Sequence, residues 1–368
     1  MNKASKIVIC EDERMLFEDV LYIKNGKNQR AVEDQNGRYP IYGSGGIMGY
    51  ANDYICRANT VIIGRKGNIN KPIYVTEPFW NVDTAFGLEA NTEVLIPKYL
   101  YYFCLRYDFE RLNKAVTIPS LTKADLLKIE INLPSIDVQA MAVDKLERIE
   151  RLLELRKQQI EALDDLIKAR FVEMFNDAEY PTERLGSICS RITDGTHKTP
   201  QYLSEGITFI SAKNIVNGKL DFTDIKHISE EEYIEIQNRC QTEIGDILLS
   251  KSGSLGAPVI VETNERLGLF ESLAVIKYDR EKLLPEFLCE QLKSDKVQRQ
   301  FVSGTKGVAV KHLHLGVISD TEIVVPPLEE QQAFASFVTQ VDKSKVVVQK
   351  ALDEAQLLFD SLMQKYFG

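Results

Sequence analysis

A long stretch that occurs twice constrains the fold of this chain most. Residues 133–175 and 325–367 align without a gap at an offset of 192, so that Gln139 falls on Gln331. In each copy a proline, Pro134 or Pro326, precedes apolar residues that alternate in spacings of four and three, which is typical of a coiled-coil seam. At 1.5 Å per residue, about 40 residues make a helix of roughly 60 Å. The predicted seam comprises Leu146, Ile149, Leu153, Ile160, Leu163, Ile167, Val338, Val341, Val348, Leu352 and Phe359.

An ordinary amphipathic surface helix is the alternative for each copy. The ungapped repeat argues against it, because two such helices in one chain can bury each other's seams. A charged residue interrupts each seam once, Arg156 in the first copy and Lys345 in the second. Interruptions at different places can fix the register of the pair.

The segments that precede the two long stretches repeat as well. Residues 245–261 match residues 59–75, and residues 285–301 match a predicted helix over residues 97–112 that opens with proline. Short apolar runs between turn residues predict strands over residues 60–64, 72–76 and 127–133. The chain therefore reads as an α+β domain followed by a long helix, present twice. The expected parts are residues 1–132, 133–177, 178–324 and 325–368.

Composition limits the class of protein. The 368 residues suggest two or three domains, and 44% hydrophobic residues with a mean hydropathy of −0.19 are typical of a soluble globular chain. The apolar run over residues 7–10 is too short for a signal peptide or a membrane span. Six scattered cysteines without a C-x-x-C pair indicate reduced thiols in the cytoplasm and no zinc site.

The charge distribution is more informative than the net charge of −9. That net charge argues against an indiscriminate nucleic-acid binder. Residues 54–76, 247–261 and 301–319 nevertheless contain lysine or arginine and no carboxylate. Such windows are compatible with local anion-binding faces, although chance clustering of solvated lysines would look the same.

Catalytic motifs are missing from the sequence. The glycines over residues 43–46 form neither a P-loop nor a complete G-x-G-x-x-G motif, and Ser252 lacks the frame of a nucleophile elbow. We expect no catalytic residue and no metal ligand in this chain.

Several stretches together resemble the specificity (S) subunit of type I restriction-modification systems. In the first half these are YGSGGIMGYANDY from Tyr42, VIIGRKGNINKPIYV from Val61 and FWNVDTAF from Phe79. In the second half they are TDGTHKTPQY from Thr193, GITFISAKNI from Gly206, KHISEEEY from Lys226 and GDILLSKSGSLG from Gly245. LPSIDVQ at 133 and VPPLEEQQ at 325 resemble the segments that open the family's conserved helices, although Ser135 and Val138 depart from the usual pattern.

The resemblance implies a non-catalytic subunit with two target-recognition domains, each reading one half of a bipartite double-stranded DNA site. It implies that the two long helices pack antiparallel as a spacer with pseudo-twofold symmetry and dock two methyltransferase (M) subunits. It also implies that restriction (R) subunits complete the complex. S-adenosylmethionine, ATP and Mg are expected on those partners and not on this chain.

From the charge placement and the family resemblance, we expect the polar loops of the acid-free windows to face DNA, with basic residues mainly on phosphate and polar or aromatic residues on bases. Two alternatives remain, an enzyme with an unrecognised site and a coiled-coil scaffold with two protein-binding modules. Activity of the purified chain would indicate the first, and absence of sequence-specific DNA binding the second. The predicted DNA-binding residues are Tyr42, Ser44, Arg65, Lys66, Asn68, Asn70, Lys71, Trp80, Thr196, His197, Lys198, Lys213, Asn214, Lys251, Ser252, Ser254, Lys306 and Lys311.

Overall fold

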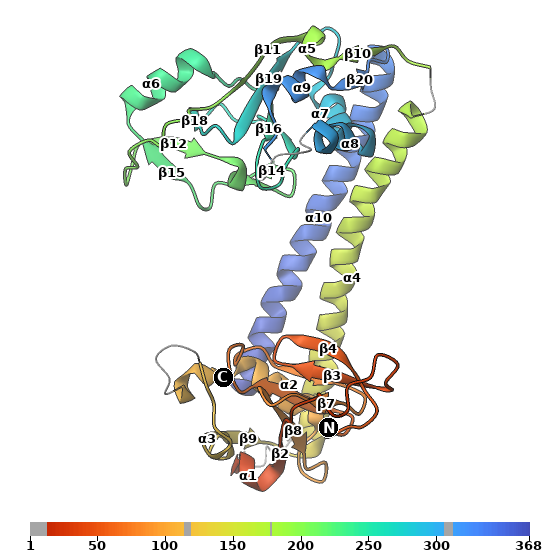
Figure 1. The fold of residues 1–368 in the computed structure, drawn as a ribbon, viewed down its shortest axis with the longest axis vertical. Coiled ribbons are helices and arrows are strands. Elements are labelled where there is room, and N and C mark those ends of the chain that lie inside the picture. Colours follow the sequence, from red (N-terminus) through yellow and green to blue (C-terminus); the bar gives the residue numbers. More distant parts are fainter. Residues whose placement is uncertain (1–12, 114–118, 177–178, 305–311) are drawn as a thin grey trace, which may run out of the picture. The chain divides into compact units, whose positions relative to one another are not determined.

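Each of the two long helices contributes one half to each of two units of the chain (Figure 1). The computed structural model describes residues 13–113, 119–176, 179–304 and 312–368. Unit 1 comprises the chain up to Lys157 together with Lys350–Gly368, and unit 2 comprises Gln158–Gln349. Both units mix helices with strands, as the repeat predicted.

Unit 1 consists of short strands, three short helices, a 3-10 turn and parts of the long helices. The helices are α1 (Phe17–Val20), α2 (Pro97–Arg106), α3 (Lys123–Leu127) and the first half of α4 (Ile136–Phe175), with the 3-10 turn η1 at Phe109–Leu112. The strands are β1 (Glu13–Leu16), β2 (Leu21–Asn25), β3 (Tyr39–Gly43), β4 (Gly46–Ala51), β5 (Thr60–Gly64), β6 (Ile73–Val75), β7 (Trp80–Asn81), β8 (Ala85–Ala90) and β9 (Glu130–Leu133).

Unit 2 follows the same order of shared strands and adds the 3-10 turn η2, the hairpin β13–β14 and the helix α6, with α8 in the place of η1. Its helices are α5 (Leu185–Ile188), α6 (Glu230–Arg239), α7 (Pro285–Lys293), α8 (Asp295–Gly304), α9 (Leu315–Asp320) and the first half of α10 (Leu328–Phe367), with the 3-10 turn η2 at Ala212–Asn214. Its strands are β10 (Thr182–Arg184), β11 (Cys189–Asp194), β12 (Ile207–Ile210), β13 (Ile215–Val216), β14 (Lys219–Leu220), β15 (Lys226–Ile228), β16 (Ile247–Ser250), β17 (Pro258–Ile260), β18 (Leu267–Leu269), β19 (Leu273–Tyr278) and β20 (Glu322–Val324).

The sheets of the two units have the same topology. The four-stranded sheet β2-β8-β5-β6 corresponds to β11-β19-β16-β17, and the three-stranded sheet β4-β3-β7 corresponds to β15-β12-β18. In both three-stranded sheets the central strand has one antiparallel and one parallel neighbour. Both units therefore present the turns that follow β3 and β12, and those that follow β5 and β16, from equivalent places in the fold.

Within each unit, a segment of α4 packs antiparallel on a segment of α10. In unit 1, Ile149 and Leu153 form a buried cluster with Ala355, and Leu352 and Phe359 pack against it. In unit 2, Ile167 and Phe171 share a core with Phe334, Val338 and Val341. All residues of the predicted seam are buried or half-buried. The interruption at Lys345 is neutralised, because its ammonium group lies 2.6 Å from Asp164 and 3.2 Å from Asp342.

A buried glutamine ties the start of each long helix to its globular domain. The Gln139 amide donates to the carbonyls of Val94 and Pro134, at 2.9 and 2.8 Å, and accepts a hydrogen bond from the backbone N–H of Ile96 at 2.9 Å. Gln331 makes the same three contacts with Lys282, Pro326 and Leu284 at 2.8–2.9 Å. Both side chains are completely buried. Since one side chain serves three backbone groups beside the first turn of α2 or α7, it fixes where each helix leaves its domain.

Several predicted boundaries differ from the structure, three of them by more than two residues or by a break in a helix. The helix expected over residues 97–112 ends at Arg106, because Tyr107 is extended and Asp108 caps a separate 3-10 turn. The helix expected over residues 285–301 is broken at Ser294, which is also extended and starts α8. The strand expected over residues 127–133 begins only at Glu130, since α3 continues to Leu127.

The cysteines that the structure describes are free and mostly buried. Burial raises the pKa of the Cys56 thiol to about 12, so this group is un-ionised at neutral pH. Among the described residues, no helix is long and apolar enough to cross a membrane, and no group of His, Cys, Asp and Glu side chains is arranged to hold a metal ion.

Candidate nucleic-acid interface

Two polar loops of unit 2 lie along one open groove of about 650 Å³. The first, residues 211–218, follows β12, and the second, residues 251–256, follows β16. Both contain residues with a positive φ, Asn217 and Gly218 in the first loop and Gly253 and Gly256 in the second, which turn the chain sharply. Of the predicted DNA-binding residues, Lys213, Ser252 and Ser254 line this groove. Their hydroxyl and ammonium groups give it hydrogen-bond donors and acceptors.

Asn214 has a structural role, and its prediction as a DNA contact is corrected. Its side chain is 3% exposed. It accepts a hydrogen bond from the N–H of Ser211 at 3.0 Å and donates to the carbonyls of Asp221 and Asp224, each at 3.1 Å. These contacts hold the 211–218 loop in shape. The neighbouring Lys213 remains exposed, with its ammonium group 2.9 Å from Asp224.

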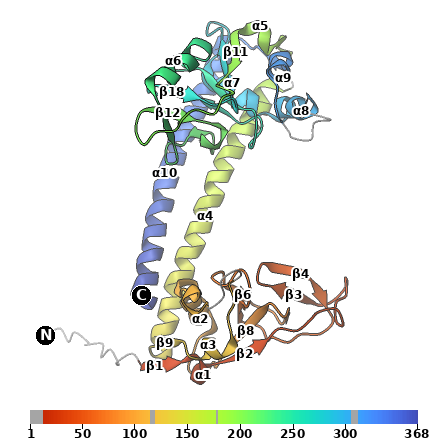
Figure 2. The ribbon, with the colours of Figure 1, turned by 60° about the vertical axis from the view of Figure 1, so that its left-hand side comes forward.

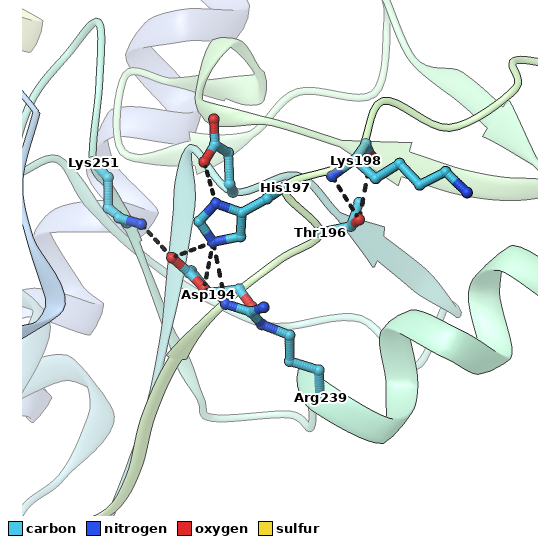
Figure 3. Close-up of polar contacts among 7 residues, drawn as sticks. Asp194, Thr196, His197, Lys198, Arg239 and Lys251 are labelled. Atoms are coloured by element: carbon cyan, nitrogen blue, oxygen red, sulfur yellow. Dashed lines mark hydrogen bonds and ion pairs between the residues drawn. The ribbon is translucent and has the colours of Figure 1, made fainter.

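Lys251 is the second correction, because the structure buries it. It is 3% exposed, and its ammonium group forms an ion pair with Asp194, which is 2% exposed (Figure 3). Arg239, from the end of α6, binds the same carboxylate. Burial raises the pKa of the Asp194 carboxyl, but hydrogen bonds from Lys251 and Arg239 lower it by more, so that this pKa lies below its usual value. The Lys251 ammonium group thus neutralises a buried charge instead of facing DNA.

His197 connects this buried pair to the surface. Its Nε2 lies 3.3 Å from Asp194 and 3.1 Å from Arg239, and its Nδ1 lies 2.6 Å from Glu271 (Figure 3). The next residue, Lys198, is exposed and points away from Asp194. Its backbone N–H donates to the Thr196 hydroxyl at 3.2 Å. The network therefore anchors a turn that presents Lys198 to solvent.

A second, smaller pocket of about 240 Å³ lies between this turn and α6. It is lined by Thr196, His197 and Lys198 on one side and by Glu232, Glu235 and Arg239 on the other. Cationic and anionic groups thus face the same space. Arg239 was not among the predicted residues, since nothing in the pattern of α6 shows that its last turn meets Asp194, 45 residues earlier.

In unit 1 the corresponding turns also meet. A Cβ placed on Gly64 would lie 3.0 Å from the Cβ of Ser44, so the turn between β3 and β4 lies against the end of β5. The basic loop that follows carries the predicted residues Arg65, Lys66, Asn68, Asn70 and Lys71, all exposed.

Arg65 and Lys251 occupy equivalent backbone positions. The N–H of Arg65 donates to Thr84 and that of Lys251 to Ser272, each at 2.8 Å, and both carbonyls accept from a leucine N–H. The Arg65 guanidinium nevertheless stays exposed, 5.8 Å from the centre of the Phe86 ring. The same backbone position therefore carries an exposed cationic side chain in unit 1 and a buried one in unit 2.

The remaining predicted residues of unit 1 are more constrained. The Asn70 side chain donates to Asp108 at 3.0 Å and accepts from the N–H of Phe109 at 2.7 Å, while remaining exposed. Tyr42 is half-buried against Phe79. Trp80 is a further correction, since it is 7% exposed and its indole N–H donates to the carbonyl of Lys27 at 3.0 Å.

Lys306 and Lys311 lie outside the described residues. Ile47 and Met48 are exposed residues that the sequence analysis missed, at 55% and 61%. Their signal was an apolar pair directly after a glycine-rich turn, within a motif already quoted for the family resemblance.

Comparisons with known proteins agree with this arrangement. The family model described as type I restriction modification DNA specificity domain matches residues 13–165 and again residues 179–355. The type I restriction enzyme EcoBI specificity subunit of Escherichia coli is 23% identical over 347 residues, which cover 83% of this chain and 72% of that protein. The MjaVIII specificity subunit of Methanocaldococcus jannaschii is 20% identical over 371 residues, with coverage of 92% and 87%.

Solved structures show the same fold. A type I restriction-modification S subunit from M. genitalium superposes with a TM-score of 0.59 at 18% identity, covering 99% of this chain and 98% of that one. A chain from a structural study of type I restriction-modification assembly and conformational transition superposes with a TM-score of 0.60 at 16% identity, covering 98% and 99%. With the family model matched over both repeats, the chain belongs to the type I restriction-modification DNA specificity family, as a non-catalytic specificity subunit.

Proposed function

We propose that this chain reads a bipartite DNA target for a type I restriction-modification complex, one half-site for each globular domain. The observation that carries the proposal is a duplicated frame with different polar loops. The two sets of sheets have the same strand order. The loops at equivalent places nevertheless expose different side chains, as at Arg65 and Lys251. Recognition of two unrelated half-sites would require such a shared scaffold with different side chains in its loops.

The exposed groups divide into two classes of contact. Lys66, Lys71, Lys198 and Lys213 are exposed cations, and we assign them to phosphates. Side chains that can donate and accept hydrogen bonds, such as those of Ser252 and Ser254 in the groove, are assigned to base edges. Arg65 can do either, because a guanidinium binds phosphate and also forms a bidentate pair with guanine.

The two long helices are proposed to act as an antiparallel coiled-coil spacer and to dock two methyltransferase subunits. Support comes from apolar residues that stay exposed on them. Leu155 and Val347 are equivalent positions of the repeat and are 51% and 69% exposed, and the equivalent Leu166 and Leu358 are 47% and 51% exposed. Each unit therefore carries one member of each pair. If the seam occupies heptad positions a and d, Leu155 and Val347 fall at position c, and Leu166 and Leu358 fall at position g. Positions c and g are neighbours on the helix surface, so in an antiparallel pair they lie on the same side of the seam.

Two equivalent apolar faces favour two copies of one partner. Exposed apolar side chains at matching positions of both repeats are best explained by burial in a complex. Restriction subunits would join the same assembly. S-adenosylmethionine, ATP and Mg would bind to those partners, and we expect the complex to act in the cytoplasm.

A domain exchange tests the reading function. Residues 182–319 are replaced by the matching part of another specificity subunit, and the hybrid is expressed with its methyltransferase subunits. Sequencing of the methylated motifs in genomic DNA should show one half-site changed and the other retained. A change in both half-sites, or in neither, would contradict independent reading by the two domains.

The docking face is tested separately by stoichiometry. Replacing Leu155 and Leu358 by glutamate should remove one methyltransferase subunit from the complex, as measured by native mass spectrometry. Replacing Leu166 and Val347 should also remove one, and the fourfold variant should remove both. Glutamate at Ile234, an exposed apolar residue of α6, provides the control. Unchanged stoichiometry in the fourfold variant would rule out this face.

A further inference from the structure

The tip of the β3–β4 hairpin contains a glycine that the packing of the chain does not explain. A Cβ placed on Gly45 would meet no atom within 4 Å, and the φ angle of this residue is not in the left-handed region. An alanine would therefore fit. Its neighbour Gly46 differs, because a φ of 118° requires glycine there. When neither the packing nor the φ angle of the chain requires a glycine, the position is one where another molecule can approach the backbone closely.

Two apolar residues come directly after this tip in the sequence. Ile47 is 55% and Met48 61% exposed. The pairing of β3 with β4 shifts here from Ile41 opposite Gly49 to Tyr42 opposite Ile47, so Met48 is an extra residue of β4, as in a β-bulge, and both apolar side chains stay exposed. β4 is also the edge of its sheet, and Figure 2 shows β3 and β4 at the end of unit 1 away from α4. Gly43 makes room for Met48, since a Cβ there would lie 2.7 Å from the methionine sulfur.

The surroundings of the tip favour DNA as its partner. Residues 43–48 carry no charge, and the tip lies beside the end of β5, where the basic loop of residues 65–71 begins. Asp34 lies at the opposite end of the hairpin, where its N–H donates to the carbonyl of Tyr50 at 2.9 Å, whereas Glu77 is close enough to Tyr42 to add to the effect of burial in raising the pKa of that hydroxyl. The tip itself is uncharged and adjoins the basic loop, which allows it to approach a polyanion.

We propose that the β3–β4 tip enters the major groove of the first half-site, with the Gly45 backbone against base edges and Ile47 and Met48 against thymine methyl groups. The inference rests on the proposed DNA-reading function. The major groove admits a two-stranded β-ribbon, and the C5 methyl of thymine is exposed there to apolar contact. The contact adds apolar readout to the polar and basic groups of the adjoining loop.

The test uses the complex assembled with its methyltransferase subunits. Affinity is measured for a DNA duplex that carries the motif found by methylome sequencing. It is also measured for the same duplex with deoxyuridine in place of thymine in the first half-site, a change that removes only methyl groups. The wild-type complex should bind the deoxyuridine duplex about fourfold more weakly for each thymine methyl group that the tip touches. The Ile47→Ala/Met48→Ala variant should bind both duplexes with nearly equal affinity. Tyr22→Ala, at an exposed residue of β2, should behave like wild type.

The second arm is Gly45→Ala. Because the chain has room for the methyl group, the melting temperature of the variant should equal that of wild type. Its specific affinity should fall roughly tenfold or more through overpacking against the bases. Affinity within twofold of wild type would overturn the insertion, and equal wild-type binding of both duplexes would overturn the methyl contact. If the wild-type complex failed to prefer its motif over a scrambled duplex, the proposed function itself would be wrong.

Discussion

Removing the charge of Asp194 should destabilise unit 2 strongly, because it leaves the Lys251 ammonium group buried without a counter-charge. Asp194 and Lys251 are 2% and 3% exposed. Loss of one partner of a buried ion pair typically costs about 3–5 kcal/mol. For a unit of this size, each kcal/mol lowers the melting temperature by about 2–4 °C. We therefore expect Asp194→Asn to melt about 6–20 °C below wild type.

Differential scanning calorimetry of the purified chain provides the assay. The double variant Asp194→Leu/Lys251→Met removes both charges and should recover most of the loss, since apolar replacement of a buried pair is often neutral. Asp224→Asn removes the partner of the exposed Lys213 and should cost less than about 1 kcal/mol. If Asp194→Asn destabilised unit 2 no more than Asp224→Asn, the assignment of Lys251 to a buried pair would be refuted.

The same residue predicts a pH dependence. The pKa of the Asp194 carboxyl is depressed in the folded state, so its contribution to stability is present above the unfolded pKa of about 3.9 and is lost as the pH falls through the lower folded value. The difference in stability between wild type and Asp194→Asn should therefore be largest near neutral pH and shrink below about pH 4. A difference that did not change with pH would mean that the charge of Asp194 is not what stabilises the unit.

Three further predictions concern the buried Gln139, the predicted phosphate contact of Lys66 and the length of the DNA spacer. Gln139→Leu leaves one backbone N–H and two carbonyls unpaired and should lower the free energy of unfolding of unit 1 by at least about 2 kcal/mol in denaturant titrations; a smaller loss would mean that the glutamine is dispensable. Lys66→Gln should reduce the slope of log affinity against log salt by about 0.9, whereas Lys251→Gln should change stability and leave the slope unaltered; equal slopes for Lys66→Gln and wild type would count against its phosphate contact. Matched insertions of four residues after Arg156 and after Val348 add about 6 Å to each helix and should lengthen the unread DNA spacer by about two base pairs in methylome sequencing; an active variant with the original spacer would refute a helix-length ruler.

Much of the fold could be predicted because its signals are local or periodic. The alternating spacing of apolar residues predicts the long helices α4 and α10, and a proline opens α2 and α7 as expected. The offset of 192 predicts two copies of one unit, because homologous stretches with the same apolar pattern fold alike. The helix breaks at Tyr107 and Ser294 were not predicted, since the apolar pattern runs on across both positions.

The candidate site was predicted only in part, because burial of a polar residue depends on partners far away in the chain. Of the loops that line the groove in unit 2, only residues 251–256 lie in an acid-free window, and in unit 1 only the loop that follows β5 does. Nothing in those windows distinguishes Arg65, which stays exposed, from Lys251, which is held by Asp194 from 57 residues earlier.

The sequence by itself thus determined the repeat, the long helices, the family and the loops where recognition is sought, all of which follow from residue order and spacing. Only the tertiary structure decided which of the predicted side chains are exposed. Trp80, Asn214 and Lys251 pack or bond inward, whereas Ile47 and Met48 remain exposed beside Gly45. The physical reason is that a polar group can be buried only where the fold supplies hydrogen-bond or charge partners for it, and those partners can come from residues far away in the chain, as Asp194 does for Lys251.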